Sequence, residues 1–251
     1  MAKRRKKKIQ DFDRGYDILR YFVDFFVKKS YRDILYINKE NIPSDGAIMF
    51  APNHTNTLMD ALVILSIDHT PKVFVARADI FKNPILARIF SFLKIMPIMR
   101  HRDGFSAVKK NYEIIKKSVD VLMDKIPFCI FPEGTRNRTD AFLLEFKPGA
   151  VSLAKKTNAY LVPFGITGDY KFRSKNLTVR YGEPFKVENM TVEEANEKLY
   201  REVERLMREN LDEEKYDRVI SEAVAYNQKL LGRRNHYLLS DEQKAEYNEL
   251  L

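Results

Sequence analysis

The chain has 251 residues and a net charge of +9 at pH 7, and its hydrophobic fraction of 45% is enough to build a core. Its length allows one large domain or two small ones. The single cysteine, Cys129, excludes an internal disulfide, and the absence of any run of about 20 apolar residues argues against an ordinary transmembrane helix. The excess of positive charge favours a polyanionic partner, which could be a nucleic acid, a phosphorylated substrate or an anionic membrane.

The chain begins with a basic block in which six lysines and arginines follow one another at residues 3–8. No apolar segment with a small-residue cleavage site follows it, so we expect no signal peptide. A helix is predicted over residues 12–28, because its polar positions fall three or four residues apart and form one narrow stripe. Those polar positions are Asp13, Asp17, Arg20, Asp24 and Lys28.

Almost every other position of this first helix is large and apolar. Such a helix must bury its surface in protein or lie in a membrane interface. Because the neighbouring basic block would attract anionic lipid, we favour membrane docking over a plain core helix. A nucleic-acid-binding tail is a third interpretation, and the apolar helix argues against it.

Strand patterns then alternate with helix patterns, which indicates an α/β domain with a mixed, largely parallel sheet flanked by helices. Predicted strands cover residues 31–38, 47–51, 72–76, 95–99, 127–131, 160–166 and 176–181, with Pro163 expected to break the sixth. Predicted helices cover residues 60–67, 83–93, 106–125 and 150–156, and a further one begins at the capping box of Thr191 and Glu194. A second capping box falls at Ser240 and Gln243.

Three units follow from this division. Residues 1–30 form a basic tail and an amphipathic, membrane-binding helix, residues 31–210 form the α/β domain, and residues 211–251 form a helical C-terminal extension to which no role is assigned. In an open α/β sheet, ligands bind beyond the carboxyl ends of the strands. The chemistry is therefore expected in the loops at that edge.

The first such loop contains His54 and Asp60, which follow the strand predicted at residues 47–51. A histidine needs an orienting carboxylate to act as a general base near neutral pH. The alternative is that His54 is a plain loop residue and that Asp60 only favours a helix start. This octapeptide, Asn53 to Asp60, cannot decide between the two by itself.

Two further charged loops fall at the same edge. Residues Arg100, His101 and Arg102 follow the strand predicted at residues 95–99, and the loop from Glu133 to Arg138 follows the strand at residues 127–131. Gly134 lets backbone approach a ligand closely, and Arg136 and Arg138 can grip phosphate oxygens. Together the loops predict a basic pocket for a phosphorylated molecule whose hydroxyl His54 would deprotonate.

Four blocks in order resemble the glycerolipid acyltransferase family, which includes the glycerol-3-phosphate and lysophosphatidate acyltransferases. They are Asn53-His54 with Asp60, Arg100 after an apolar strand, Phe131-Pro132-Glu133-Gly134-Thr135-Arg136, and Val162-Pro163. The third block is the most specific. The resemblance covers residues 47–166, with a weaker similarity of layout to about residue 210, and it implies the fold of that family.

The resemblance also implies roles. His54 would be the general base, and Asp60 would orient it. Pro163 would belong to the wall of the acyl-donor site. The residues that would hold the glycerol-phosphate part of the acceptor are Arg100, Glu133, Gly134, Thr135 and Arg136. The donor would be acyl-CoA or acyl-carrier protein, with no metal, no other cofactor and no covalent acyl-enzyme.

The expected reaction is therefore acyl transfer to lysophosphatidate (1-acylglycerol-3-phosphate), which forms phosphatidate on the cytoplasmic face of a membrane. Glycerol-3-phosphate and other lysophospholipids stay open as acceptors, because five residues separate His54 from Asp60 where the common family pattern has four. A non-enzymatic lipid- or nucleic-acid-binding module is the remaining alternative. The chain has no recognisable nucleic-acid motif, so no nucleic-acid partner is expected.

Overall fold

The computed structural model describes residues 8–31, 34–56, 59–68, 70–99, 105–138, 141–168 and 177–231, with the backbone alone for 105–110 and 212–231. Seven strands form one sheet in the order β1-β7-β6-β2-β5-β3-β4. Neighbouring strands are parallel except for β6 and β7, which are antiparallel. The predicted fold class, a mixed and largely parallel sheet flanked by helices, is therefore confirmed.

The strands are β1 (Ile34–Ile37), β2 (Ile48–Pro52), β3 (Val73–Arg77), β4 (Ile95–Ile98), β5 (Phe128–Cys129), β6 (Tyr160–Gly168) and β7 (Leu177–Tyr181). Every residue of β2 and of β7 is buried, as expected for strands covered on both faces. Cys129 lies in β5 and is buried, as its apolar neighbours in the sequence predict.

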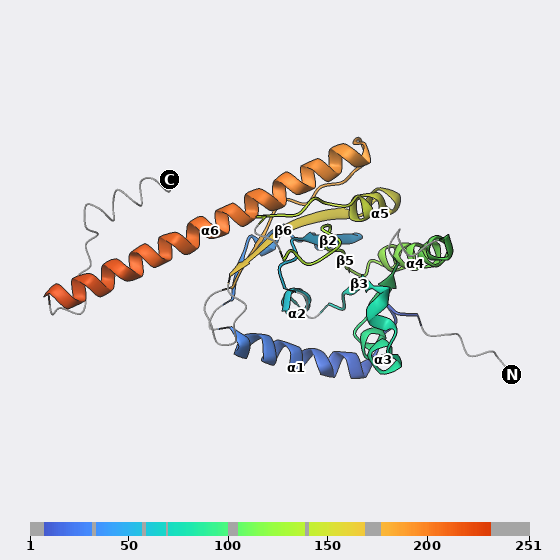
Figure 1. Cartoon of the computed structure of the whole chain (residues 1–251), viewed down its shortest axis with the longest axis horizontal. Helices are drawn as coiled ribbons and strands as arrows, with labels where there is room; N and C mark the ends of the chain where they lie inside the picture. The colour runs from blue at the N-terminus through green and yellow to red at the C-terminus, as the bar shows by residue number, and fades with distance from the viewer. Residues whose placement is uncertain are drawn as a thin grey trace.

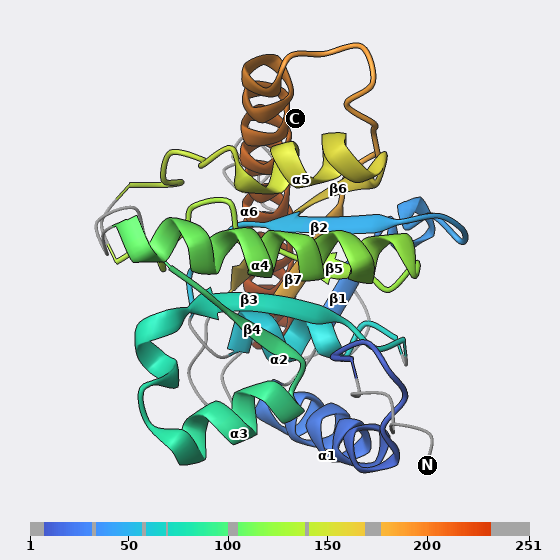
Figure 2. The ribbon, with the colours of Figure 1, turned by 90° about the vertical axis from the view of Figure 1, so that its right-hand side faces the viewer.

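The helices are α1 (Arg14–Ser30), α2 (Met59–Leu65), α3 (Pro84–Phe92), α4 (Phe105–Met123), α5 (Gly149–Thr157) and α6 (Val192–Leu231), with short 3-10 turns at Lys39–Asn41 and Ala78–Phe81. Figures 1 and 2 show the sheet between two helical layers. Helices α1 and α2 cover one face, and α4, α5 and α6 cover the other. Each face has its own apolar core.

Pro163 does not break β6, which continues from Tyr160 to Gly168. The carbonyl oxygen of Pro163 accepts a hydrogen bond from the amide of Gly182, at 2.9 Å. In a strand, the nitrogen of a residue faces the same side as its carbonyl, so the missing N–H of Pro163 faces the segment beyond the end of β7. The ladder with β2 on the other side is unaffected, which is why the proline is tolerated here.

The first and last helices carry the predicted caps. Asp13 caps α1 by accepting from the amides of Gly15 and Tyr16, and Thr191 and Glu194 form the predicted capping box of α6. Helix α6 continues as one helix of 40 residues through the predicted domain boundary at residue 211, and Figure 1 shows it projecting past the sheet. Ser240 and Gln243 lie outside the described residues. In the described part of the chain, no helix combines the length and the hydropathy needed to cross a bilayer.

Candidate active site

The loop after β2 brings His54 and Asp60 together. Asp60 lies in the first turn of α2 and is fully buried, and its Oδ2 is 2.9 Å from Nδ1 of His54. A carboxylate can only accept, so Nδ1 carries the hydrogen of a neutral His54 imidazole. The nitrogen left to take a proton from a substrate is then Nε2, as a general base requires.

The same carboxylate shapes the loop that separates it from His54. Oδ2 of Asp60 also accepts from the backbone amides of Thr55, at 2.9 Å, and Asn56, at 2.8 Å. Asn56 in turn accepts from the amide of Met59 and so closes the entry to α2. The Asp60 carboxylate therefore binds both the ring of His54 and the two residues that follow it.

Neighbouring residues fix the orientation of His54. Its ring stacks on Phe131, with ring centroids 4.0 Å apart and an angle of 23° between the planes. Its carbonyl accepts from the amide of Asn137, at 2.8 Å, which lies in the loop after β5. The histidine is held from both its ring and its backbone, so little reorganisation is needed before it can act.

Glu133 joins the two loops of the site. Its Oε1 accepts from the amide of His54, at 2.5 Å, and its Oε2 accepts from the amide of Leu144, at 3.1 Å. Burial raises the pKa of Glu133, and the two amide hydrogen bonds only partly offset that effect. Both carboxylate oxygens are thus used within the protein. The structure places Glu133 in the frame that holds His54, where a carboxylate avoids the repulsion it would have against a phosphate.

The rest of the predicted phosphate loop lies beyond Glu133. Gly134 has a φ of +65°, a left-handed conformation that favours glycine. Gly134, Thr135 and Arg138 are exposed, whereas Arg136 is partly buried. The Nε of Arg136 has no hydrogen-bond partner among the residues that the structure describes. The two arginines of this loop can therefore offer guanidinium donors to an anion, and the amide of Asn137 ties the loop to His54.

One predicted site residue, Pro163, lies apart from this group. Arg100 lies outside the described residues, as do His101 and Arg102. Pro163 is buried in β6, and its ring lies close to Gly182, where Leu206 of α6 also approaches. It therefore lies on the face of the sheet that α6 covers, whereas Asp60 stands on α2 on the opposite face.

The sequence analysis named Asn53 in its first block but gave it no role, whereas the structure shows that it supports the start of the His54 loop. The fully buried Asn53 side chain donates to the carbonyl of Ile166, at 3.0 Å, and accepts from the amide of Ile166, at 2.7 Å. The pair locks the end of β2 to β6. An asparagine directly after a wholly apolar strand was a signal that could have found it, because buried amides are kept only with partners. Nothing in the sequence pointed to the stacking of Phe131 on His54.

Among the described residues, no three histidine, cysteine, aspartate or glutamate side chains gather in a way that could hold a metal ion. The site geometry is that of a base, its orienting acid and a basic loop. A family model described as Acyltransferase matches residues 33–167, which is more than half of the chain. The chain belongs to the acyltransferase family. That range contains β2, α2 and the loop after β5, so it includes every side chain of the site just described.

Similar proteins agree with this assignment. The chain is 33% identical to the chloroplastic 1-acyl-sn-glycerol-3-phosphate acyltransferase LPAT1 of Arabidopsis thaliana over 53% of the chain and 35% of the relative. It is 28% identical to the 1-acyl-sn-glycerol-3-phosphate acyltransferase of Bacillus subtilis over 59% of the chain and 71% of the relative. The crystal structure of the acyltransferase PlsC from Thermotoga maritima shares the fold, with a TM-score of 0.62 and 23% identity over 79% of this chain and 83% of that chain. The acyltransferase described here spans about a third of the length of the plant relatives it matches.

Proposed function

We propose that this acyltransferase moves a fatty acyl group from acyl-CoA or acyl-carrier protein to the free hydroxyl of lysophosphatidate and so forms phosphatidate. The observation that carries the proposal is the buried Asp60 carboxylate on Nδ1 of His54, next to a loop with two arginines. The printed names of the similar proteins, 1-acyl-sn-glycerol-3-phosphate acyltransferases, support the choice of acceptor.

The reaction follows from the position of the two ring nitrogens. Nε2 of His54 takes the proton of the acceptor hydroxyl as its oxygen attacks the thioester carbonyl, and Asp60 stabilises the imidazolium that forms. The tetrahedral intermediate collapses, the carbon–sulfur bond breaks, and the thiolate takes the proton from His54. The products are an ester and a free thiol, and the histidine returns to its starting state.

The loop after β5 would hold the phosphate of the acceptor. Arg136 and Arg138 supply guanidinium groups, which bind phosphate oxygens in a fork. Gly134 leaves room for the ligand close to the backbone, and the hydroxyl of the exposed Thr135 can donate to it. Glu133 contributes indirectly, because it ties this loop to the backbone of His54.

The enzyme would work as a peripheral protein on the cytoplasmic face of a membrane. The outer side of α1 exposes Ile18, Tyr21, Phe22 and Phe25, and α3 adds the exposed Ile85. The two helices touch, since the rings of Tyr16 and Phe92 are 6.4 Å apart and packed edge to face. Exposed apolar surface of this kind favours contact with lipid, and an insoluble acyl-chain acceptor would be available there.

Turnover with a labelled lysophosphatidate in mixed micelles, with acyl-CoA or acyl-carrier protein as donor, tests the proposal. Removing a general base costs about 10²- to 10⁴-fold, so we expect His54→Ala to lower kcat by about 10³-fold and Asp60→Asn to lower it somewhat less. Asp45→Asn is the matched control, because Asp45 is exposed and its ion pair with Lys125 lies at the surface. Full turnover by His54→Ala would reject the mechanism.

A further inference from the structure

Helix α2 carries the orienting acid, but it is too short to be stable by itself. It has seven residues, Met59–Leu65, and Asp60 lies in its first turn. Isolated helices shorter than about 12 residues are marginal in water, so α2 depends on contacts at its two ends and along its buried side. At its start those contacts are made by the His54 loop. The contacts at its other end come from a different part of the molecule.

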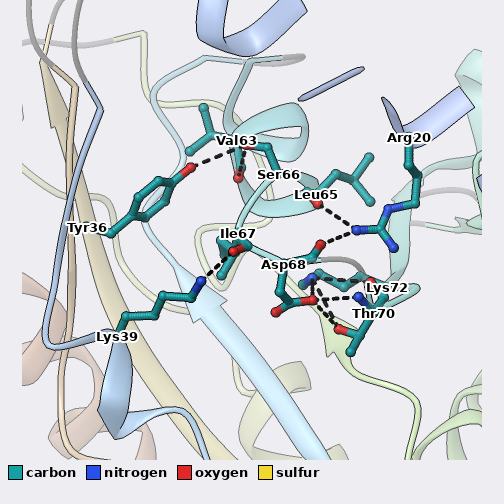
Figure 3. A network of polar contacts seen from close by, with 10 residues as sticks. All are labelled: Arg20, Tyr36, Lys39, Val63, Leu65, Ser66, Ile67, Asp68, Thr70 and Lys72. Atoms are coloured by element: carbon teal, nitrogen blue, oxygen red, sulfur yellow. Dashed lines mark hydrogen bonds and ion pairs between the residues drawn. The ribbon is translucent and has the colours of Figure 1, made fainter. Parts of the chain in front are cut away.

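Two cations hold the C-terminal end of α2 (Figure 3). One terminal nitrogen, Nη2, of Arg20 donates to the carbonyl of Leu65, at 3.3 Å, and to that of Asp68. The ammonium of Lys39 donates to the carbonyl of Ile67, at 2.7 Å. These carbonyls belong to the last turn of α2 and to the loop after it, where the helix dipole favours positive charge. The end of α2 is therefore capped by side chains from outside the helix.

Arg20 makes this cap from an unusual position. It lies on α1, where it is 3% exposed, while Tyr21 and Phe22 beside it are 66% and 67% exposed. The helix that presents aromatic side chains outward thus turns one of its two arginines, Arg20, inward to α2, while Arg14 is exposed. Because a guanidinium reaches two carbonyls at once, a displacement of α1 would move or release the end of α2.

A second anchor keeps the loop after α2 in place without α1. The fully buried Lys72, directly before β3, donates to Oδ1 of Asp68, at 2.8 Å. The amide of Thr70 donates to the same oxygen, at 2.7 Å. Removal of Arg20 should therefore loosen the end of α2 but leave the loop tied to β3. Substitution of Arg20 should therefore leave the fold intact but alter the geometry of the active site.

We propose that Arg20 is a positioning residue for the His54–Asp60 pair and that it couples the seating of α1 to catalysis through α2. The seven residues of α2 span only about 10 Å, at a rise of about 1.5 Å per residue, so a shift at one end reaches Asp60 at the other. Catalytic geometry tolerates displacements of only about 0.5 Å. The catalytic part of the inference rests on the proposed function, whereas the coupling of Arg20 to His54 does not.

The first measurement needs no activity. Nitrogen-15 NMR of histidine-labelled protein reports which ring nitrogen of His54 carries the hydrogen, and His54→Ala identifies the signal among the four histidines. We expect Arg20→Met to lower the fraction of His54 with hydrogen on Nδ1, in the same direction as Asp60→Asn. Arg14→Met, an exposed arginine of the same helix, is the matched control and should leave the spectrum unchanged.

The second measurement is turnover in mixed micelles. We expect kcat to fall about 10- to 100-fold in Arg20→Met, with a KM for the donor within about twofold of wild type, and Arg20→Lys to recover most of the loss because it keeps a charged donor. In a protein that already carries Asp60→Asn, Arg20→Met should lower kcat by less than a further factor of about three, since its effect passes through Asp60. Should the Met variant fail to fold, Arg20→Gln, which keeps an N–H donor, takes its place in both measurements.

The outcomes separate the two proposals. The coupling would be overturned by an unchanged His54 spectrum in the folded Arg20→Met variant. It would also be overturned if the double variant lost kcat by the product of the losses in Arg20→Met and Asp60→Asn. Loss of kcat that follows loss of binding to vesicles of phosphatidylglycerol and phosphatidylcholine would also overturn it, because Arg20 would then serve only as part of an anchor. A wild-type protein without acyl transfer, but with the expected change in the His54 spectrum, would reject the proposed function and leave the coupling intact.

Discussion

Helices α1 and α6 cover opposite faces of the same sheet and differ in the polarity of their outer sides. Helix α6 places Ala195, Leu199 and Val203 against the core and lines its outer side with ion pairs such as Arg201–Glu197, at 2.7 Å. Helix α1 buries Arg20 and Ser30 beside the apolar Tyr16 and Val27, and it exposes aromatic side chains such as Phe22. Both helices pack on a sheet face of the same kind. Their outer sides therefore differ: that of α6 carries ion pairs, and that of α1 carries exposed apolar side chains, as the proposed contact of α1 with a membrane requires.

The charged side chains near the two helices also differ in how far they are buried. Under α1, the charges of Arg20, Asp68 and Lys72 gather around the end of α2 (Figure 3). Along the outer side of α6, Arg201 and Arg208 pair with glutamates one turn away in the open. Buried charges are costly to leave unpaired, whereas exposed pairs contribute little. Substitutions should therefore have large effects on the α1 side and small effects along α6.

The largest effect on stability is expected from Asp68→Asn. This change leaves the buried Lys72 without its carboxylate. Because the Asp68 side chain is itself 31% exposed, we expect the lower end of the range of about 3–5 kcal/mol that breaking a buried ion pair costs. We expect that loss in the free energy of unfolding, measured with urea. Asp45→Asn is the matched control, because its ion pair with Lys125 is exposed. If both changes lowered the free energy of unfolding by the same small amount, enclosed and exposed charges would not differ in their contribution to stability.

The same pair predicts a dependence on pH. Burial by itself would raise the pKa of Asp68, but the Lys72 ammonium and the hydrogen bonds from Lys72 and Thr70 outweigh burial and hold the pKa below its usual value. A carboxyl with a lowered pKa contributes stability that is present above its unfolded pKa of about 3.9 and is lost as pH falls through the folded pKa. The gap between wild type and Asp68→Asn should therefore narrow below about pH 4.

The next effect in size concerns the outer side of α1. The double change of Phe22→Ser and Phe25→Ser removes two exposed aromatic rings. Since burial of one phenylalanine contributes about 1.5–3 kcal/mol and about 1.4 kcal/mol is a factor of 10, we expect binding to anionic vesicles to weaken about 100-fold. Turnover in mixed micelles and the free energy of unfolding should change little. Vesicle co-sedimentation measures the first quantity.

A control variant sharpens this comparison. Tyr112 and Met123 of α4 are also exposed and apolar, but α4 covers the other face of the sheet. Tyr112→Ser with Met123→Ser should leave vesicle binding within about twofold of wild type, because exposed apolar residues without a partner surface are ordinary. If both pairs weaken binding equally, general hydrophobicity rather than the α1 surface attracts the lipid.

Local sequence patterns predicted α1 and the loops of the site, but not the contacts between residues that lie far apart in the chain. The period of the polar residues predicted α1 and its stripe, and the loops after β2 and β5 were identified by their residue types. The period did not say that the stripe containing Arg20 faces the protein, because its carbonyl partners lie 45 and 48 residues away. The link from Glu133 to His54 spans 79 residues, and the pairing of Asn53 with Ile166 spans 113. Contacts of this range depend on the order of the strands, which no local pattern contains.

The smallest effect is expected along α6. Arg201→Ala removes one exposed ion pair with Glu197, which is worth about 0.3–0.5 kcal/mol at an i,i+4 spacing on a helix. We expect a loss of about that size in the free energy of unfolding, less of a loss in high salt because exposed charges are screened, and no change in vesicle binding. Denaturation in urea at two salt concentrations measures it, with the Asp68→Asn variant beside it. A loss of several kcal/mol from Arg201→Ala would mean that α6 also encloses its charges, and the contrast between the charges under α1 and those along α6 would then be lost.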